Sequence, residues 1–511
     1  MGVPKKTSKV SVIIQAQNEQ ETIGGLINEI KRLNPHETIV VVNGSTDDTE
    51  KIAKNLDCNV IIFSEALGIN VGKSIGALKA EGDILLFLDG DMVIKAEKLK
   101  PFITAIENGN DVALNDLNIL IRKKRIFTTS LCKVALNTLL KRRDLLVNSF
   151  VAIPNAISKA ALRKIGWWNL TDPPTTQAMA VLHNLKITIP TKINVVGLNP
   201  IRKETHKTRE RNSPYMKSTS RIVGDHISAL NLLINERGKR GGFTGERDFT
   251  VLKKVNSYPF QFEKHSKVKR SAVISVDSKK KNLESNIRQL LHANVEDIVL
   301  LIEKNNLDSI NKYTEMEQVT LVELPETYQP FMSRVLGANN ATGENILFIE
   351  SDKPITSWEV LNFYTEAEKG VGIVLNKDSH FLESMYPICQ QTIIKCFLNT
   401  IIKKPSFLNN SLYSTPHVLN RKVLEQIGTE SLMIPALAYT KAITAGYTIS
   451  APYAIGEEGI QLDDDLVLGD HLEAIKYYLS KAGIRGGFND GGKNRKLLEQ
   501  LKIEEGDLDV E

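Results

Sequence analysis

Short apolar runs alternate with amphipathic stretches along the first hundred residues. The apolar runs predict strands at 10–14, 38–42, 60–63 and 84–88, and the stretches between them predict helices near 21–33, 49–56 and 73–80. This alternation favours an α/β fold in which helices cover a mostly parallel, Rossmann-like sheet. Ligands of such sheets bind beyond the carboxyl ends of the strands, so we expect the functional residues there.

The pattern repeats in the second half of the chain. GALKAEGDILLFLDGD from Gly76 matches GANNATGENILFIESD from Gly337, 261 residues later, without a gap. LNTLL from Leu136 returns as LNTII from Leu398, in the same order. Ordered matches of this kind indicate a tandem duplication. We therefore predict a first domain at 1–250, a polar, basic linker at 251–267 and a second domain at 268–511.

Composition narrows the class of protein. A chain of 511 residues with 42% hydrophobic and 24% charged residues is globular and too long for one core. A net charge of +5 is small beside 65 basic and 60 acidic side chains, so we expect no nucleic acid as a partner. The four cysteines lack zinc spacing and suit a reduced compartment. Without a signal-like segment or a run of about 18 apolar residues, we expect a cytoplasmic protein.

Three polar clusters follow predicted strands and should meet at one edge of the sheet. They are Gln17-Asn18-Glu19, the turn that begins at Asn43, and Asp89-Gly90-Asp91. Two carboxylates separated by a glycine can hold Mg2+ or Mn2+ against a diphosphate, and the metal would stabilise charge on a leaving group. A turn that merely ends the strand explains the same three residues equally well.

Two further residues fit an anionic nucleotide. The amide of Asn43 could pair with the edge of a uracil or guanine base. Lys73, at the start of a predicted helix, could reach the phosphates of the same nucleotide. A solvated turn is the commoner explanation of a Gly-Lys pair at such a position.

Taken in order, SVIIQAQNEQETI, IVVVNGSTDDT, the Gly-Lys before GALKAEGD, and LLFLDGD resemble the successive signatures of family 2 glycosyltransferases of the GT-A fold. The resemblance covers about 200 residues. It implies a nucleoside pocket lined by Gln17, Asn18, Glu19 and Asn43, with Asp89 and Asp91 as the metal-binding DxD motif. The family's usual Pro-x-Tyr-Asn-Glu reads Gln15-Ala16-Gln17-Asn18-Glu19 here, which leaves the preferred base and sugar open.

The resemblance also implies a general base that deprotonates the acceptor in a single inverting displacement. Counting back from the helix predicted at 175–182 places Asp172 at or beside that position, although an Asp-Pro turn explains Asp172 nearly as well. Related enzymes close a basic loop over the diphosphate, which makes His206 a candidate metal ligand and His226 a second one. A purely structural role is the commoner one for either histidine.

The second repeat keeps few of these residues. Asn18 and Glu19 become Lys279 and Lys280, Lys73 becomes Arg334, and Asp89 and Asp91 become Glu350 and Asp352. We therefore predict a degenerate, non-catalytic second domain.

The predicted activity is transfer of a sugar from a UDP- or GDP-sugar to an acceptor hydroxyl, as in the synthesis of cell-envelope or surface glycoconjugates. The alternative is a non-catalytic nucleotide-binding scaffold of two decayed domains. The acceptor stays open between a saccharide, a protein and a lipid-linked group. The basic and apolar segment 121–143 suits peripheral contact with a membrane and suits an ordinary packing helix at least as well. A homo-oligomer is compatible with the sequence.

Overall fold

The computed structural model describes residues 8–122, 124–200, 202–211, 213–254, 268–276, 281–303, 310–313, 315–380, 382, 384–456 and 462–508. The described chain forms two compact units. Unit 1 comprises Met1–Leu233 together with Gly487–Glu511, and unit 2 comprises Ile234–Gly486. Most of the segment 251–267, predicted as a linker, lies outside the described residues.

Unit 1 is built on a seven-stranded sheet in the order β3-β2-β1-β4-β6-β5-β7. Strands β3, β2, β1 and β4 are parallel, and β6 runs antiparallel to both of its neighbours. The strands are β1 (Val10–Ala16), β2 (Glu37–Asn43), β3 (Asn59–Phe63), β4 (Ile84–Asp89), β5 (Val112–Asn115), β6 (Asn155–Ser158) and β7 (Ile187–Thr191). The four strands predicted from the apolar runs are confirmed.

Helices cover this sheet. They are α1 (Ile23–Lys31), α2 (Thr49–Asn55), α3 (Val71–Lys79), α4 (Ala96–Glu107), α5 (Thr128–Leu139), α6 (Lys159–Ile165), α7 (Pro173–Leu182), α8 (Val195–Leu198), α9 (Lys217–Arg237) and α17 (Arg495–Leu508). Helix α3 packs directly on β1 and β2. Gly76 makes this close approach possible, because a Cβ atom there would lie 2.4 Å from Cγ2 of Ile13.

The register of the parallel strands brings the predicted polar clusters to one edge. Gln15 of β1 pairs with Asp89 of β4, and Ala16 pairs with Val42 of β2. The three strands therefore end at the same level, and the turns after them share one side of the sheet.

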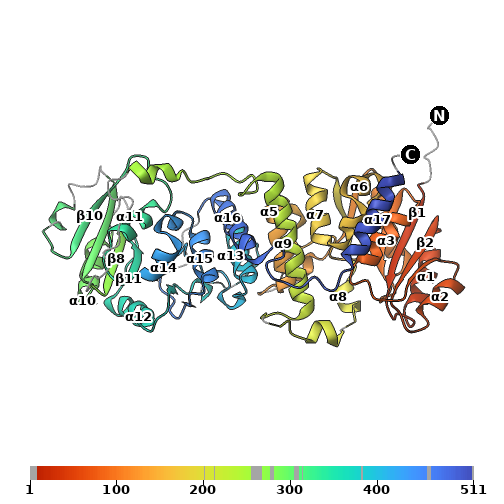
Figure 1. Cartoon of the computed structure of the whole chain (residues 1–511), viewed down its shortest axis with the longest axis horizontal. Helices are drawn as coiled ribbons and strands as arrows, with labels where there is room; N and C mark the ends of the chain where they lie inside the picture. The colour runs from red at the N-terminus through yellow and green to blue at the C-terminus, as the bar shows by residue number, and fades with distance from the viewer. Residues whose placement is uncertain are drawn as a thin grey trace. The chain divides into compact units, whose positions relative to one another are not determined.

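Unit 2 repeats the architecture with the strand order β10-β9-β8-β11-β13-β12-β14. Its strands are β8 (Arg270–Ser275), β9 (Asp297–Glu303), β10 (Val319–Leu324), β11 (Asn345–Glu350), β12 (Ile373–Leu375), β13 (His417–Asn420) and β14 (Ile449–Ser450). Its helices are α10 (Leu283–His292), α11 (Met332–Asn340), α12 (Ser357–Glu368), α13 (Gln390–Ile401), α14 (Arg421–Ile427), α15 (Pro435–Thr444) and α16 (Asp464–Ala482). Strands of both sheets are labelled in Figure 1. The matching strand orders confirm the α/β class and agree with a tandem duplication.

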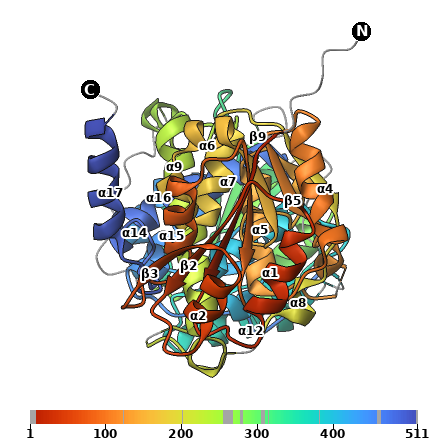
Figure 2. The same cartoon turned by 90° about the vertical axis from the view of Figure 1, so that its right-hand side faces the viewer.

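Each unit includes the tail of the other repeat. Helix α17, which ends the second repeat, belongs to unit 1 and appears as the blue helix beside its red and yellow elements (Figure 2). There the ammonium of Lys502 lies 4.1 Å from the centre of the Trp168 ring. In unit 2, Arg240 from the end of the first repeat pairs with Asp470 at 2.8 Å. The C-terminal residues must therefore be considered when the site of unit 1 is described.

Within the described residues, the helices are too short or too polar to cross a membrane.

Candidate functional site

A cavity of about 1220 Å³ lies at the carboxyl ends of β1, β2 and β4, within unit 1. Seven residues predicted from the sequence line it, namely Gln17, Glu19, Asn43, Lys73, Asp89, Asp91 and His206. Asn18 and Asp172 lie next to lining residues rather than among them. The structure thus brings most of the candidate site residues around one space.

Asp89 ends β4 and is held by two donors. Its Oδ1 accepts a hydrogen bond from Nε2 of Gln15 at 2.9 Å and lies 3.0 Å from the ammonium of Lys73. The following turn needs Gly90, whose amide donates to the carbonyl of Gln15 and whose added Cβ would lie 3.0 Å from that of Ala16. Close strand packing therefore fixes the direction of the Asp89 carboxylate.

Asp91 carries the clearest sign of a cation-binding site. It is 9% exposed, its Oδ2 lies 3.3 Å from Nη2 of Arg202, and its Oδ1 is buried without a hydrogen-bond partner. Burial raises the pKa of Asp91, and the neighbouring Asp89 raises it further. An orphaned carboxylate oxygen beside a second carboxylate suits a hard divalent cation, so the pair fits Mg2+ or Mn2+.

Glu19 extends this acidic group. Burial raises its pKa to about 7, and the charges of Asp91 and Asp89 add to the shift against the opposing effect of Arg202. Nη2 of Arg202 lies 2.6 Å from the Glu19 carboxylate and also contacts Asp91. A residue of the basic loop therefore bridges two strand-end acids in this structure.

The two asparagines hold loops. Asn18 has a positive φ of 58° and accepts a hydrogen bond from the amide of Thr46 at 2.7 Å. Asn43 accepts from the amide of Leu67 at 2.5 Å and donates to the carbonyl of Gly68 at 3.2 Å. Pairing of Asn43 with a base, as the sequence suggested, would require these bonds to rearrange and stays a prediction.

Lys73 lies beside the carboxylates. Its ammonium is 3.0 Å from Asp89 and 3.3 Å from the side-chain oxygen of Asn70, and the residue is 7% exposed. Contact with the donor phosphates stays a prediction, because a phosphate would have to compete with Asp89 for the same ammonium.

His206 lies in the short π-helix η4 (Lys203–Lys207), and its Nδ1 accepts a hydrogen bond from the amide of Arg202 at 2.9 Å. The pKa of His206 is lowered by burial first and by Arg202 and Arg221 next, which favours the neutral ring. A neutral ring that accepts through Nδ1 carries its proton on Nε2. As placed, His206 is therefore a donor suited to a phosphate oxygen, and metal binding would require the bond to Arg202 to break.

His226 lies in the core rather than the cavity. It is fully buried, and its Nδ1 donates to the carbonyl of Ile222 at 2.7 Å. His471 makes the same bond to Val467 in unit 2. A contact repeated in both units indicates a structural histidine.

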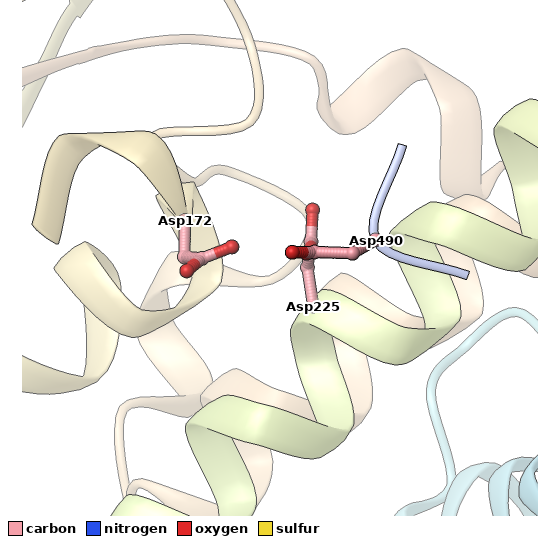
Figure 3. A group of neighbouring side chains, drawn as sticks. All are labelled: Asp172, Asp225 and Asp490. Carbon is pink, nitrogen blue, oxygen red and sulfur yellow. The ribbon is translucent and has the colours of Figure 1, made fainter. Parts of the chain in front are cut away.

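Asp172 is the N-cap residue of α7 and belongs to a group of three aspartates, two of them buried (Figure 3). Asp225 of α9 and Asp490 of the C-terminal tail are the others, and oxygens of the three carboxylates lie within 4.8 Å of one another. That spacing could hold a metal ion. In this structure protein side chains supply the positive charge beside these aspartates. The ammonium of Lys493 contacts Asp172 and lies 2.8 Å from Asp225.

Arg495 adds a bidentate contact to Asp172, at 2.7 and 3.1 Å. Burial alone would raise the pKa of Asp172, but Lys493 and Arg495 together hold it well below its usual range. Asp172 is therefore ionised at any physiological pH. Asp89 and Asp91 fit a metal ion better than this group, because the three aspartates already lie beside positively charged side chains.

Sequence reasoning did not anticipate Asp225, Asp490, Lys493 or Arg495. The last three lie more than 300 residues after Asp172, and nothing in their spacing predicts that they return to unit 1. Sequence reasoning also passed over Lys133, which lines the cavity from α5.

Comparison with known proteins supports the class of domain. Residues 11–164 match the family described as Glycosyl transferase family 2. An undecaprenyl-phosphate 4-deoxy-4-formamido-L-arabinose transferase of Proteus mirabilis is 32% identical over 123 residues, covering 22% of this chain and 38% of that protein. A dolichol-phosphate mannosyltransferase of Pyrococcus furiosus is 33% identical over 114 residues, covering 21% of this chain and 32% of that protein. The chain therefore spans only about a third of the length of these relatives.

Among solved structures, the glucosyl-3-phosphoglycerate synthase of Mycobacterium tuberculosis in complex with Mn2+, UDP and glucosyl-3-phosphoglycerate is similar. It is 18% identical, with a TM-score of 0.34, and the match covers 44% of this chain and 81% of that one. A TM-score this low adds no weight to the assignment of individual site residues.

Proposed function

We propose that unit 1, whose residues 11–164 match glycosyltransferase family 2, transfers a sugar from a nucleoside diphosphate sugar to an acceptor hydroxyl with inversion. The observation that carries the proposal is the buried, unpartnered Oδ1 of Asp91 beside Asp89, at the strand-end edge of the matched segment. A divalent cation and a diphosphate would complete that arrangement.

Asp89 and Asp91 would hold Mg2+ or Mn2+, which when bound supplies Lewis-acid stabilisation of charge on the nucleoside diphosphate that leaves. The protein's own residues orient the donor. Asn43 fixes the loop at 66–68 above the cavity, and Lys73 and Arg202 place positive charge beside the acids. His206, with its proton on Nε2, would donate to a phosphate oxygen.

Asp172 is proposed as the general base. It is ionised, and Pro173 and Pro174, which follow it, line the cavity. To accept a proton, its carboxylate would have to be released from Lys493 and Arg495, which hold its pKa well below the usual range. Lys493 and Arg495 fix its carboxylate from the tail of the second repeat, so the catalytic unit includes residues 487–511.

Unit 2 is proposed to be non-catalytic. At the position of Asp172 it has Ile434, whose backbone angles, φ −126° and ψ 86°, are close to −119° and 85° at Asp172. Glu350 takes the place of Asp89, and Arg334 lies 3.7 Å from it. Lys279 and Lys280, predicted to replace Asn18 and Glu19, lie outside the described residues.

Donor turnover provides the test. The protein would be incubated with Mn2+ and a panel of UDP- and GDP-sugars, and release of the nucleoside diphosphate would be followed. Asp89→Asn with Asp91→Asn should abolish release, whereas the matched pair Glu350→Gln with Asp352→Asn should keep it. Metal-dependent nucleotide binding without turnover of any donor would favour the scaffold. Absence of nucleotide binding would contradict both functions.

A further inference from the structure

Lys133 is a buried cation that lines the cavity of unit 1. It lies on α5, is 8% exposed, and lines the cavity. In the described part of the chain it makes no ion pair and no hydrogen bond. Burial lowers its pKa to about 8. Burying a charged ammonium costs free energy unless an anion lies beside it. A bound anion would offset this cost at Lys133.

The second repeat supplies an internal comparison. Lys133 corresponds to Lys395, 262 residues later, and each lies three residues before the LNTLL or LNTII segment that matches between the repeats. There the ammonium lies 5.4 Å from the centre of the Tyr413 ring, which provides a cation–π contact. At the position of Tyr413 the first repeat has Val151, which lines the cavity. The lysine is thus retained in both units; in unit 1 it lines the cavity, and in unit 2 it lies against the Tyr413 ring.

The surroundings of Lys133 suit an anion that carries an apolar part. Thr129 and Ser130, in the first turn of α5, line the cavity with it, and the amino end of a helix favours negative charge. Leu117, Leu120 and Phe127 line the same cavity, and Phe127 is 56% exposed.

The size of the cavity leaves room for a second ligand. Its volume of about 1220 Å³ exceeds the ~300–1,000 Å³ of a typical pocket for one small molecule. Lys73 and Arg202 form ion pairs with the acids of the proposed metal and donor site, namely Glu19, Asp89 and Asp91. Lys133 forms none of these ion pairs, so its charge is available to a second ligand.

We propose that Lys133, with Thr129 and Ser130, binds a phosphate monoester group of the acceptor. This assignment rests on the proposed glycosyl transfer, because it names the chemical class of that reaction's second substrate. The apolar wall would contact the organic part of the same molecule.

Calorimetric titration of the full chain tests the subsite with three probes: inorganic phosphate, decyl phosphate below its micelle concentration, and UDP with Mn2+. Lys133→Met should weaken binding of both phosphates about 10- to 100-fold, the effect of one charge-assisted hydrogen bond, and should leave UDP affinity unchanged. Lys133→Arg should retain phosphate binding. Lys395→Met is the matched control in unit 2 and should change nothing.

Val151→Tyr is an independent variant, because it introduces the ring that covers the lysine in unit 2. It should weaken phosphate binding without removing the charge. Tighter binding of decyl phosphate than of inorganic phosphate would identify an amphiphilic, lipid-like acceptor, and equal binding would identify a small phosphate ester. Either result supports the subsite.

Three results would overturn it: no phosphate binding by the wild type, unchanged binding in Lys133→Met, or an equal loss of UDP affinity, which would assign Lys133 to the donor. If UDP binds and phosphate does not, the subsite fails while the proposed transfer stands. If phosphate binds through Lys133 and no nucleotide does, the transfer fails instead.

Discussion

Replacing Lys493 with methionine would show whether the buried aspartate group holds the C-terminal tail in unit 1. The Lys493 side chain is fully buried, and its ammonium contacts Asp172 and lies 2.8 Å from Asp225. Methionine has a similar length and no charge. The variant therefore removes the ion pairs and changes the packing little.

The expected loss of stability follows from the burial of both partners. Breaking a buried ion pair from one side costs ~3–5 kcal/mol, because the remaining charge stays desolvated. We expect the lower end, about 3 kcal/mol, since Arg495 still contacts Asp172. For a domain of ~150–250 residues each kcal/mol shifts Tm by about 2–4 °C, so the Tm should fall by about 6–12 °C.

Differential scanning calorimetry measures this change, and unit 2 offers a matched control. Arg247 pairs with Asp470 at 3.0 Å, and Asp470 occupies the position of Asp225. Arg247→Met should lower the Tm by a similar amount. Only Lys493→Met should also weaken transfer, because Gly491 and Gly492 of the same tail line the cavity of unit 1.

A double-mutant cycle tests whether the loss of stability comes from a buried charge left without its partner. Adding Asp225→Asn to Lys493→Met removes a desolvated charge and should recover part of the lost Tm. The interpretation is refuted if Lys493→Met melts like the wild type, or if the second substitution makes the loss simply additive.

Other consequences concern catalysis, metal binding and acid stability. Asp172→Asn should lower kcat by about 10²–10⁴-fold with little change in donor KM, whereas Asp490→Asn in the same group should retain most of kcat; equal losses would contradict a base role for Asp172. Removal of metal with EDTA should abolish nucleotide binding, and Mn2+ should restore it unless Asp91 is replaced by Asn; binding that survives EDTA would contradict the metal site. His226 and His471 are buried with pKa values lowered to about 3, so each should contribute stability that is complete above about pH 6.5 and is lost as the pH falls toward 3. Each should cost about 1.4 kcal/mol per pH unit in that window, measurable by urea unfolding at pH 7 and 5, and replacement of either by Gln should reduce the slope.

The sheet and the strand-end acids were predictable from the sequence because they depend on local patterns. Apolar runs mark β1 and β4, and parallel register then places Gln15 beside Asp89. The internal repeat predicted the second sheet directly, because a segment that matches the first repeat is expected to have the same fold. Both features follow from short segments that can be recognised without knowledge of distant contacts.

The sequence did not predict that the C-terminal tail belongs to unit 1, because the residues that contact each other are far apart in the chain and form no recognisable motif. Lys493 and Arg495 follow the Arg-Gly-Gly-Phe of the second repeat, so the repeat boundary alone places them in the second domain. Individual hydrogen bonds of the site could not be predicted from sequence patterns either. The loop contacts of Asn43 and the bond from Arg202 to His206 depend on backbone positions that no motif specifies.

The ion pairs of Asp172 also determine how a base at this position depends on pH. With Lys493 and Arg495 in contact, Asp172 stays ionised well below its usual range, so its titration should produce no acid limb in kcat between about pH 4 and 8. Lys493→Met removes one cation and leaves burial, which raises the pKa of Asp172. The variant should therefore show a fall in kcat toward acid pH that the wild type lacks, in addition to any pH dependence that Glu19 and Asp91 give to both proteins. Identical pH profiles in a properly folded variant would mean that Asp172 does not accept the proton.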